Sequence, residues 1–324
     1  MKNRITKASI IIRNYNGKEL LSEFLPSVMD AVLFRGDMDE VIIIDDGSTD
    51  GSADFVKKEY PSIRLVKIFP NSGNSIIPVN VGVKAAKNDI VICLDNDVKV
   101  EKDFIAPLLK QFNKDDVFAV CAKIYNPLNG MRIESFNYPR FHRGRLAGHI
   151  QENGASKKVP GHPIEVWYAP GNGVAYDRVK FLEMKGLDPI FRPIYCEDVD
   201  VCYRAWKRGW RTICEPASIT YHFSHKTTEK NIKADYFKVI RLKNQFILTW
   251  KNLQDPRLII KHISWTFARL IFALLNRDFI FLRGLCLASR QIPEVLQKRK
   301  KMTGSNIILS DQRLYKRLQP IDLN

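Results

Sequence analysis

The first hundred residues alternate between short apolar runs and segments with the apolar spacing of a helix. Runs of this length, bounded by polar residues and rich in β-branched side chains, are typical of buried strands. The predicted strands are 8–16, 41–50, 63–69 and 90–95, and the predicted helices between them are 17–32, 51–60 and 78–88. Pro78 is expected to open the third helix, because proline suits the first helical turn. This alternation predicts an α/β fold with a mostly parallel sheet flanked by helices.

Three of the predicted strands end in polar residues. They are Asn14, Tyr15 and Asn16 in the first strand, Asp45 and Asp46 in the second, and Asp95, Asn96 and Asp97 at the end of the fourth. Ligands bind beyond the carboxyl ends of the strands in such sheets, so we expect these side chains to meet at one crevice. A buried carboxylate is costly unless it is paired or binds a metal, so Asp95 and Asp97 should lie at a mouth open to solvent. Alternatively, the Asp-Asn-Asp sequence is a turn, which these residue types favour.

The phosphate-binding loops of two large nucleotide-binding classes are missing from this sequence. No G-x-G-x-x-G follows the first strand, and no G-x-x-x-x-G-K-[ST] occurs anywhere in the chain. A site that binds phosphates in this fold therefore needs a different means of neutralising their charge. A divalent cation bound by the acids at the end of the fourth strand is the natural candidate. Mg²⁺ and Mn²⁺ prefer one or two carboxylates together with phosphate oxygens of a substrate.

A second acidic cluster lies at the N-terminus of a predicted helix over residues 199–208. It consists of Glu197, Asp198 and Asp200, and Gly209 follows the end of the helix. Acids at this position would cap the helix and compensate its dipole even without a role in chemistry. A shorter helix is predicted after Asp177, which is a good N-cap residue.

The net charge of +16 is concentrated in the C-terminal third of the chain. Residues 226–324 hold 20 Lys and Arg against 7 Asp and Glu, a net of +13, whereas residues 1–225 are close to neutral. We therefore expect a domain over 1–225 and a helical, basic C-terminal extension over 226–324. Such an excess points to an anionic partner, and because no nucleic-acid-binding motif accompanies it, we expect a membrane surface and no nucleic acid.

Residues 258–275 are the most apolar segment of the extension. Their pattern is helical, but Lys261, His262 and Arg269 interrupt it. A charge near the centre of a spanning helix costs about 2.5–3.5 kcal/mol, so the segment is not expected to cross a membrane. It either packs on the N-terminal domain or lies in a membrane interface, where the basic run 298–301 would favour anionic lipid.

The six cysteines include no C-x-x-C pair, and the N-terminus carries no secretory signal. We therefore expect reduced thiols in a cytoplasmic protein. A zinc site using Cys196, Cys202 and Cys214 would have poor spacing.

Taken in order, these segments resemble the family 2 glycosyltransferases over residues 8 to about 225. The resemblance rests on the series SIIIRNYNG, VIIIDDGSTDGS, NSGNSIIPVNVGVKAA, LDND, PGNGVAYDR and CEDVDVCYRAWKRGW, followed by His222. Enzymes of this family use a nucleotide-diphospho-sugar and have the GT-A fold, a Rossmann-like arrangement that binds the nucleotide-sugar. Each piece alone is a weak signal, and the order and spacing carry the resemblance.

The resemblance implies a role for each of these residues. The nucleotide would be bound by Asn14, Tyr15 and Asp45, and the nucleotide-sugar would be contacted by Asn71, Gly73, Asp95 and Asn96. A Mn²⁺ or Mg²⁺ ion would be held by Asp97 with Asp95 and His222. Asp198 would be the catalytic base, beside Glu197. A purely structural role for His222 stays open.

The implied reaction moves one sugar, with inversion, from a nucleotide-diphospho-sugar donor to a hydroxyl of a glycan or lipid-linked acceptor. A divalent cation stabilises the charge on the departing diphosphate, and a carboxylate takes the proton of the attacking hydroxyl. The implied setting is bacterial cell-surface polysaccharide synthesis, on the inner face of the cytoplasmic membrane.

Two departures refine this reading, and two other classes remain. The Q-x-x-R-W motif of processive members is absent, which favours single additions, and Lys243-Asn244 stands where rhamnosyltransferase-like members often carry Arg-Asn. A sugar-phosphate nucleotidyltransferase should show a Gly-rich phosphate loop after the first strand, which this chain lacks. A catalytically inactive carbohydrate-binding relative would be expected to have lost Asp45, Asp97 or Asp198, yet all three are present.

Overall fold

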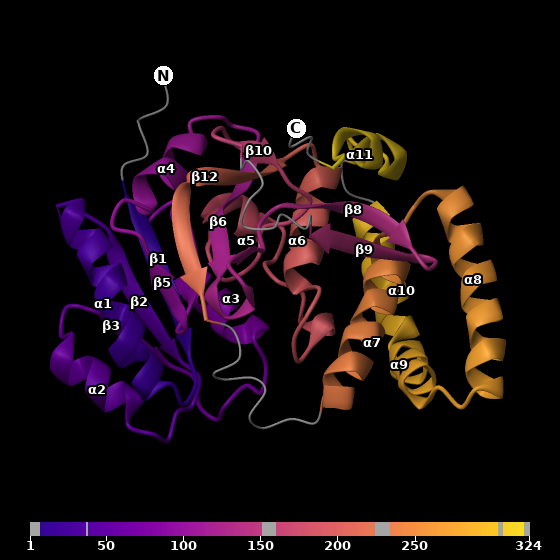
Figure 1. Cartoon of the computed structure of the whole chain (residues 1–324), viewed down its shortest axis with the longest axis horizontal. Coiled ribbons are helices and arrows are strands. Elements are labelled where there is room, and N and C mark those ends of the chain that lie inside the picture. Colours follow the sequence, from indigo (N-terminus) through magenta and orange to yellow (C-terminus); the bar gives the residue numbers. More distant parts are fainter. Residues whose placement is uncertain (1–6, 37, 151–159, 224–233, 304–306, 321–324) are drawn as a thin grey trace.

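A sheet runs through the N-terminal two thirds of the chain, with helices on both of its faces (Figure 1). The computed structural model describes residues 7–36, 38–150, 160–223, 234–303 and 307–320. The strands are β1 (Ala8–Asn14), β2 (Glu40–Asp45), β3 (Arg64–Lys67), β4 (Ile90–Asp95), β5 (Val98–Val100), β6 (Val117–Asn126), β7 (Arg132–Ile133), β8 (Asn137–His142), β9 (Arg145–Ile150), β10 (Ile164–Glu165), β11 (Val174–Asp177) and β12 (Arg211–His222).

The helices divide into those that flank the sheet and those that follow it. The first group is α1 (Lys18–Phe34), α2 (Ser52–Glu59), α3 (Ile76–Ala85), α4 (Ile105–Gln111), α5 (Arg178–Glu183) and α6 (Glu197–Lys207). The second group is α7 (Ala234–Asn252), α8 (Pro256–Leu275), α9 (Phe279–Ser289), α10 (Ile292–Thr303) and α11 (Asp311–Arg317). Single 3₁₀ turns occur at Pro127–Asn129 (η1) and Pro189–Phe191 (η2).

The sheet is mixed, with a parallel core. Its strand order is β10-β12-β6-β11-β4-β1-β2-β3, with β5 paired to β12 and β7 to β6. The pairs β1–β2, β1–β4, β2–β3 and β6–β12 are parallel, whereas β11 runs antiparallel between β4 and β6. The predicted mostly parallel α/β architecture is therefore confirmed, and β8 and β9 form a separate hairpin.

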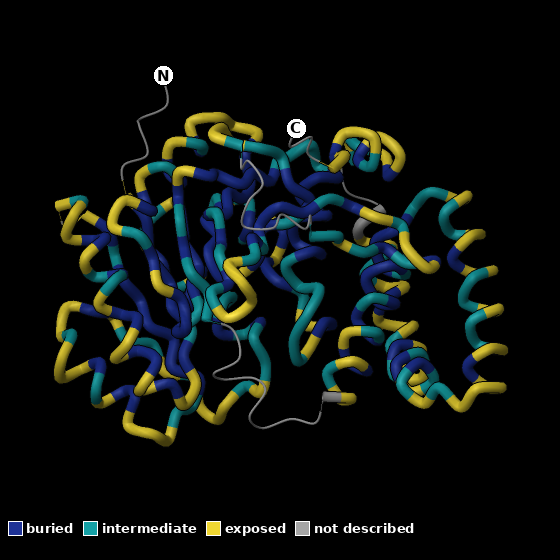
Figure 2. Tube along the Cα trace, viewed as in Figure 1, coloured by how far each residue is buried: buried dark blue, intermediate teal, exposed yellow. Residues whose placement is uncertain are grey.

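Successive residues of the central strands pack into different cores. In β1, Ile10 and Ile12 join the core that contains residues of α1 and α4, whereas Ile11 joins the core that contains residues of α3, α5 and α6. Burial on both faces explains why these strands read as uninterrupted apolar runs rather than as alternating ones. Figure 2 shows the resulting buried centre and exposed periphery.

Two predicted helix starts need correction. Helix α3 begins at Ile76, because the side chain of Asn74 accepts hydrogen bonds from the backbone N–H groups of Ile76 and Ile77 at 3.1 and 2.9 Å. Pro78 is thus the third helical residue, where a backbone N–H has no intrahelical acceptor anyway. Helix α6 begins at Glu197 rather than at residue 199. The predicted cap at Asp177 is confirmed, since its carboxylate accepts from the N–H of Lys180 at 3.0 Å.

The C-terminal segment is helical, as predicted, and packs on the rest of the chain. Helix α7 contacts α6, α9, α10 and β9, and Lys207 of α6 forms a buried ion pair with Asp311 of α11 at 2.8 Å. The predicted boundary at residue 225 lies outside the described residues. All six cysteines are free thiols, in agreement with the sequence.

Helix α8 lies at the outer edge of the molecule (Figure 1). Among the described helices it alone is long and apolar enough to cross a membrane, and only 11% of its most apolar stretch is buried. Two residues of the predicted basic run 298–301 have partners within the protein: Lys298 pairs with Asp188 at 2.8 Å, and Arg299 donates to the carbonyl of Trp250 at 2.8 Å. Lys300 and Lys301 are exposed, and attraction of the run to lipid stays a prediction.

Candidate active site

The carboxyl ends of β1, β2 and β4 bring the predicted polar residues together. Strand β1 lies between the other two, and their register sets Asn14 opposite Asp45. The side chain of Asn14 donates to Asp45 at 3.1 Å and accepts from Asn96 at 2.8 Å. All three side chains are buried, and these hydrogen bonds fix them as a polar floor at the carboxyl ends of the strands.

The loop after β3 closes one side of this floor. Asn71 donates to the backbone carbonyl of Asp46 at 2.5 Å and accepts from the N–H of Gly73 at 2.8 Å. Gly73 has φ +67°, a conformation that favours glycine. The carboxylate of Asp46, to which we assigned no role, holds the same loop through Ser72 at 2.6 Å. Tyr15 is 48% exposed and remains accessible to a ligand.

Asp95, Asp97 and His222 form a cluster with the composition of a cation site. One ligand atom from each lies within 4.8 Å of the other two. Antiparallel pairing of β12 with β5 brings His222 to this place, with its Nε2 3.6 Å from Oδ1 of Asp97. That Oδ1 atom is buried and has no hydrogen-bond partner. Burial and the charge of Asp95 raise the pKa of Asp97, which is the condition that a bound cation would relieve.

Arg13, which the sequence analysis missed, lies between the two acidic clusters. It forms a two-pronged ion pair with Asp95, whose second contact joins Nη2 to Oδ2 at 2.9 Å. Burial alone would raise the pKa of Asp95, but the guanidinium outweighs it and lowers that pKa. The charges of Asp95, Glu197 and Asp97 likewise outweigh burial and raise the pKa of Arg13. The register pairs Arg13 with Asp95 directly, so a strand alignment could have predicted this contact.

Two further residues orient His222. Its Nδ1 lies 3.2 Å from a carboxylate oxygen of Glu134 and 2.5 Å from the side-chain nitrogen of Asn172. These contacts direct Nε2 toward Asp97, as partners behind a metal-binding imidazole do. Asn172 belongs to the PGNGVAYDR segment and was therefore detectable, whereas Glu134 follows a two-residue strand and no pattern marks it.

The Glu197-Asp198 pair opens α6. Cys196, at the N-cap position, has φ +73°, and Asp198 accepts from the N–H of Val199 at 2.7 Å. One oxygen of Glu197 accepts from the hydroxyl of Ser75 at 2.9 Å, and the other is buried without a partner. Burial, together with the charge of Glu197, raises the pKa of Asp198 to about 7. A carboxylate with such a pKa can exchange a proton near neutral pH.

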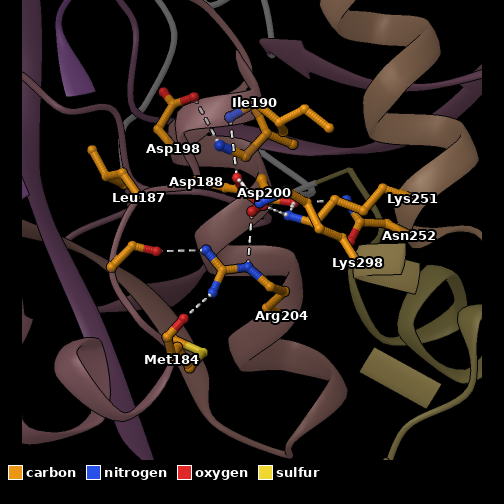
Figure 3. Close-up of polar contacts among 12 residues, drawn as sticks. Met184, Leu187, Asp188, Ile190, Asp198, Asp200, Arg204, Lys251, Asn252 and Lys298 are labelled. Atoms are coloured by element: carbon orange, nitrogen blue, oxygen red, sulfur yellow. Dashed lines mark hydrogen bonds and ion pairs between the residues drawn. The ribbon is translucent and has the colours of Figure 1, made fainter. Parts of the chain in front are cut away.

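Asp200, two residues further on, is in a different environment (Figure 3). Its side chain is fully buried and accepts from Arg204 at 2.8 Å, from Lys251 at 2.7 Å and from Asn252 at 2.9 Å. Lys251 also pairs with Asp188 at 2.7 Å. Asp200 thus ties the acidic helix to α7, and it has no access to a substrate.

Lys243 and Asn244 hold the loop that leads into α6. The amide of Asn244 donates to the carbonyls of Phe191, Ile194 and Tyr195 at 2.6–3.0 Å. The ammonium of Lys243 donates to the carbonyl of Arg192 at 2.6 Å. The two residues therefore fix the backbone immediately before Glu197.

Part of the chain matches a known protein family. Residues 9–163 match the model of Glycosyl transferase family 2. This region is similar to the domains of that family. It contains the strand ends, the Asp95-Asn96-Asp97 segment and Glu134, while Asn172, Glu197, Asp198 and His222 follow it.

The curated relatives are longer than the stretch they share with this chain. A poly(ribitol-phosphate) beta-glucosyltransferase of Bacillus spizizenii is 36% identical over 94 residues, which are 28% of this chain and 15% of that protein. The chain spans between 15% and 35% of the length of the first curated relatives it matches.

Two solved structures share the GT-A fold over most of the chain. S. aureus TarS 1–349 with UDP-GlcNAc has a TM-score of 0.57 at 16% identity, covering 91% of this chain and 88% of that one. The mannosyltransferase PcManGT of Pyrobaculum calidifontis with GDP-Man and Mn²⁺ has a TM-score of 0.53 at 15% identity, covering 91% and 84%.

Proposed function

We propose that this chain transfers one sugar, with inversion, from a nucleotide-diphospho-sugar to a hydroxyl of a glycan or lipid-linked acceptor. The observation that carries the proposal is the presence of two acidic clusters, one suited to a cation and one containing a carboxyl group with a raised pKa, with Arg13 between them. One is the Asp95–Asp97–His222 cluster, and the other is Glu197-Asp198 at the start of α6. Arg13 pairs with Asp95, and Ser75, whose carbonyl lies 3.5 Å from Arg13, hydrogen-bonds Glu197.

Asp97 and His222 would hold Mn²⁺ or Mg²⁺, and the unpartnered Oδ1 of Asp97 fits this role. Carboxylate oxygen with one imidazole nitrogen is a donor set that Mn²⁺ accepts readily. Both oxygens of Asp95 already accept from Arg13, so Asp95 would contribute through its remaining lone pairs. When bound, the cation supplies Lewis-acid stabilisation of the leaving diphosphate.

Asp198 would be the base. It would take the proton of the acceptor hydroxyl as that oxygen bonds to the anomeric carbon and the nucleoside diphosphate leaves from the opposite face. Glu197 would keep the acceptor or the helix end in place through its bond to Ser75. Backside displacement of this kind inverts the anomeric centre without an enzyme-bound intermediate.

The donor would lie over the floor formed by Asn14, Asp45 and Asn96, with Tyr15 against its base and the Asn71-Gly73 loop beside its sugar. UDP-GlcNAc in TarS and GDP-Man in the mannosyltransferase are the donors of two structures with this fold. These two structures support a nucleotide-diphospho-sugar as the donor of this chain. The base and the sugar of that donor have to be identified by experiment.

A role in bacterial cell-surface polysaccharide synthesis is supported by the relatives' names, among them a poly(ribitol-phosphate) glucosyltransferase and a poly-beta-1,6-N-acetyl-D-glucosamine synthase. We also assign the chain to the rhamnosyltransferase-like, non-processive subset. This assignment rests on Lys243-Asn244, which stands where members of that subset often carry Arg-Asn, and on the absence of the Q-x-x-R-W motif of processive enzymes.

We further propose that the chain is cytoplasmic and peripheral on the membrane, attached through α8. Five side chains at helical spacing, each 45–65% exposed, form one apolar stripe along it: Ile260, Ile263, Phe267, Ile271 and Leu274. The opposite side carries His262, which is buried, and Arg269, which pairs with Asp278. One face is thus held by protein and the other is apolar, which suits a helix lying in an interface of anionic lipid.

A panel of UDP-, GDP- and dTDP-sugars tests the enzymatic proposal. We expect Mn²⁺-dependent hydrolysis of one class of donor in the absence of acceptor, together with a rise in Tm caused by binding. Binding without hydrolysis would instead indicate an inactive carbohydrate-binding relative. Formation of a nucleotide-sugar from a nucleoside triphosphate and a sugar phosphate would indicate a nucleotidyltransferase.

A further inference from the structure

A cavity of about 360 Å³ lies between the tip of the β8–β9 hairpin, α7, α8 and the start of α9. Five cations line it: Arg143, Arg145, Lys238, Arg241 and Arg269. Asp278 is the one acid in its lining. We call this cavity the basic pocket. None of its lining residues belongs to the cation cluster or to the floor of the donor crevice.

The hairpin tip is fixed to α8, so the basic pocket is formed before any ligand arrives. Trp250 donates its indole N–H to Nε2 of His262 at 2.7 Å, and Nδ1 of the same histidine donates to the carbonyl of Gly144 at 2.5 Å. Gly144 has φ +66°, and a Cβ there would meet the Trp265 side chain at 2.8 Å. Only glycine therefore allows this close approach, which fixes Arg143 and Arg145 on either side.

The protein compensates only part of the positive charge of the basic pocket. Asp278 pairs with Arg269, and Asp235 forms an exposed pair with Lys238 at 3.0 Å. Arg145 packs its guanidinium over the rings of Phe246 and Trp265 at 5.3 and 5.2 Å, and has no carboxylate partner among the described residues. Nη1 of Arg145 and Nη1 of Arg269 are both buried without an acceptor. Burial and the charges of Arg143 and Arg269 lower the pKa of Arg145 to about 10.

Unsatisfied guanidinium groups are costly, and an anion with several oxygens would satisfy them. Arginine recognises phosphate through paired N–H donors, which a group of arginines at one cavity provides. The volume exceeds that of a single phosphate and is within the range of pockets that hold a small molecule. The aromatic side chains of Phe237, Trp265 and Phe281 give the remaining walls an apolar surface that suits a sugar ring or a lipid chain.

Two residues that line the basic pocket contact Tyr195, in the loop that leads into α6 and its proposed base. The guanidinium of Arg241 lies 4.7 Å from the ring centre of Tyr195, and Phe237 lies edge-on to the same ring at 6.1 Å. Tyr195 precedes Asp198 by three residues. A molecule anchored in the basic pocket therefore lies on the Glu197-Asp198 side, where the acceptor belongs.

We propose that the basic pocket binds a phosphate or diphosphate group of the acceptor, so that the acceptor hydroxyl reaches Asp198. The phosphate stays on the acceptor throughout, and the transferred sugar forms its new bond to the hydroxyl alone. This inference rests on the proposed function for its biological meaning. Two acceptor classes have this chemistry, namely a soluble phosphodiester glycan and a phosphate-linked lipid.

Binding of inorganic pyrophosphate to the full chain, measured by titration calorimetry in EDTA, tests the basic pocket without donor or metal. We expect Arg145→Gln and Arg241→Gln each to weaken binding at least tenfold, because each removes one guanidinium. Arg241 is exposed, so its replacement leaves the fold intact even if loss of Arg145 does not. Lys316→Gln, which removes an exposed charge outside the basic pocket, should keep binding within twofold.

Equal pyrophosphate binding by the wild type and both arginine variants would overturn the inference. Because no donor is present, this outcome is independent of the donor hydrolysis that tests the proposed function. Vesicles of phosphatidylcholine with one-fifth phosphatidic acid then identify the source of the phosphate, when the arginine changes are compared in a Phe267→Glu background that removes attachment through the apolar stripe of α8. Loss of vesicle binding in both arginine variants indicates a lipid phosphate, and unchanged vesicle binding with weakened pyrophosphate binding indicates a soluble acceptor.

Discussion

Replacing Asp200 by Asn should destabilise the protein severely, although the residue lies two positions from the proposed base. The carboxylate is fully buried and accepts from Arg204, Lys251 and Asn252. Asparagine keeps the shape but removes the charge, which leaves buried Arg204 without its carboxylate partner and Lys251 with Asp188 alone. Breaking a buried ion pair from one side costs about 3–5 kcal/mol, which is a large part of a typical stability of about 5–15 kcal/mol.

Urea unfolding followed by tryptophan fluorescence measures this loss. We expect the midpoint of Asp200→Asn to fall by about 1–2 M, with remaining folded molecules still able to bind donor. The matched control is Asp235→Asn, which removes an exposed pair with Lys238 and should cost less than about 1 kcal/mol. If Asp200→Asn were as stable as the wild type but lost a hundredfold or more in turnover, Asp200 would be a participant in the chemistry and the structural reading would be wrong.

Three further predictions concern the proposed cation site, the apolar stripe of α8 and the pKa of Asp198. Asp97→Ala should abolish Mn²⁺-dependent turnover without lowering Tm, and full activity of the wild type in EDTA would refute a cation role. Phe267→Glu on α8 should release the protein from vesicles containing anionic lipid, whereas Leu33→Asp, of similar exposure on α1, should not. Because the pKa of Asp198 is raised to about 7 in the folded chain, its stabilising contribution is full below about pH 4 and is lost as the pH rises through 7. Asp198→Asn should therefore be more stable than the wild type at pH 8, by on the order of 1–4 kcal/mol, and no more stable at pH 4; a variant less stable at pH 8 would contradict this.

Residues at strand ends could be predicted because their position depends on backbone pattern alone. Asn14, Asp45, Asn96 and Asp97 follow buried apolar runs, and parallel strands end at one edge of the sheet, so their convergence needed no side-chain detail. The cluster formed by His222 required one more step, the pairing of β12 with β5, which the sequence marked only as a strand-like stretch.

Residues whose roles depend on tertiary contacts were not predictable in the same way. Arg13 lies within an apolar run and gains its role from the strand register, while Glu134 reaches His222 from a region without periodicity. Asp200 was grouped with Glu197 and Asp198 because sequence shows proximity along the chain and not orientation. Only the helix geometry separates a side chain facing the crevice from one facing α7.

A deletion after residue 250 would not test membrane attachment cleanly. The deletion would remove Lys251 and Asn252, which hydrogen-bond Asp200, and Asp311, which pairs with Lys207. Buried charges of α6 would then lose these partners. Single substitutions on the exposed apolar stripe of α8 avoid this difficulty, because those side chains do not belong to the buried ion pairs of α6.

The turnover of Asp198→Asn tests the central claim most directly. Asparagine can still accept the hydrogen bond from the N–H of Val199 but cannot take a proton. With the donor identified from the nucleotide-sugar panel, we predict a 10²–10⁴-fold fall in kcat with donor affinity nearly unchanged, since general-base catalysis supplies about that factor. Transfer by Asp198→Asn at close to the wild-type rate would show that Asp198 is not the base and would contradict the account.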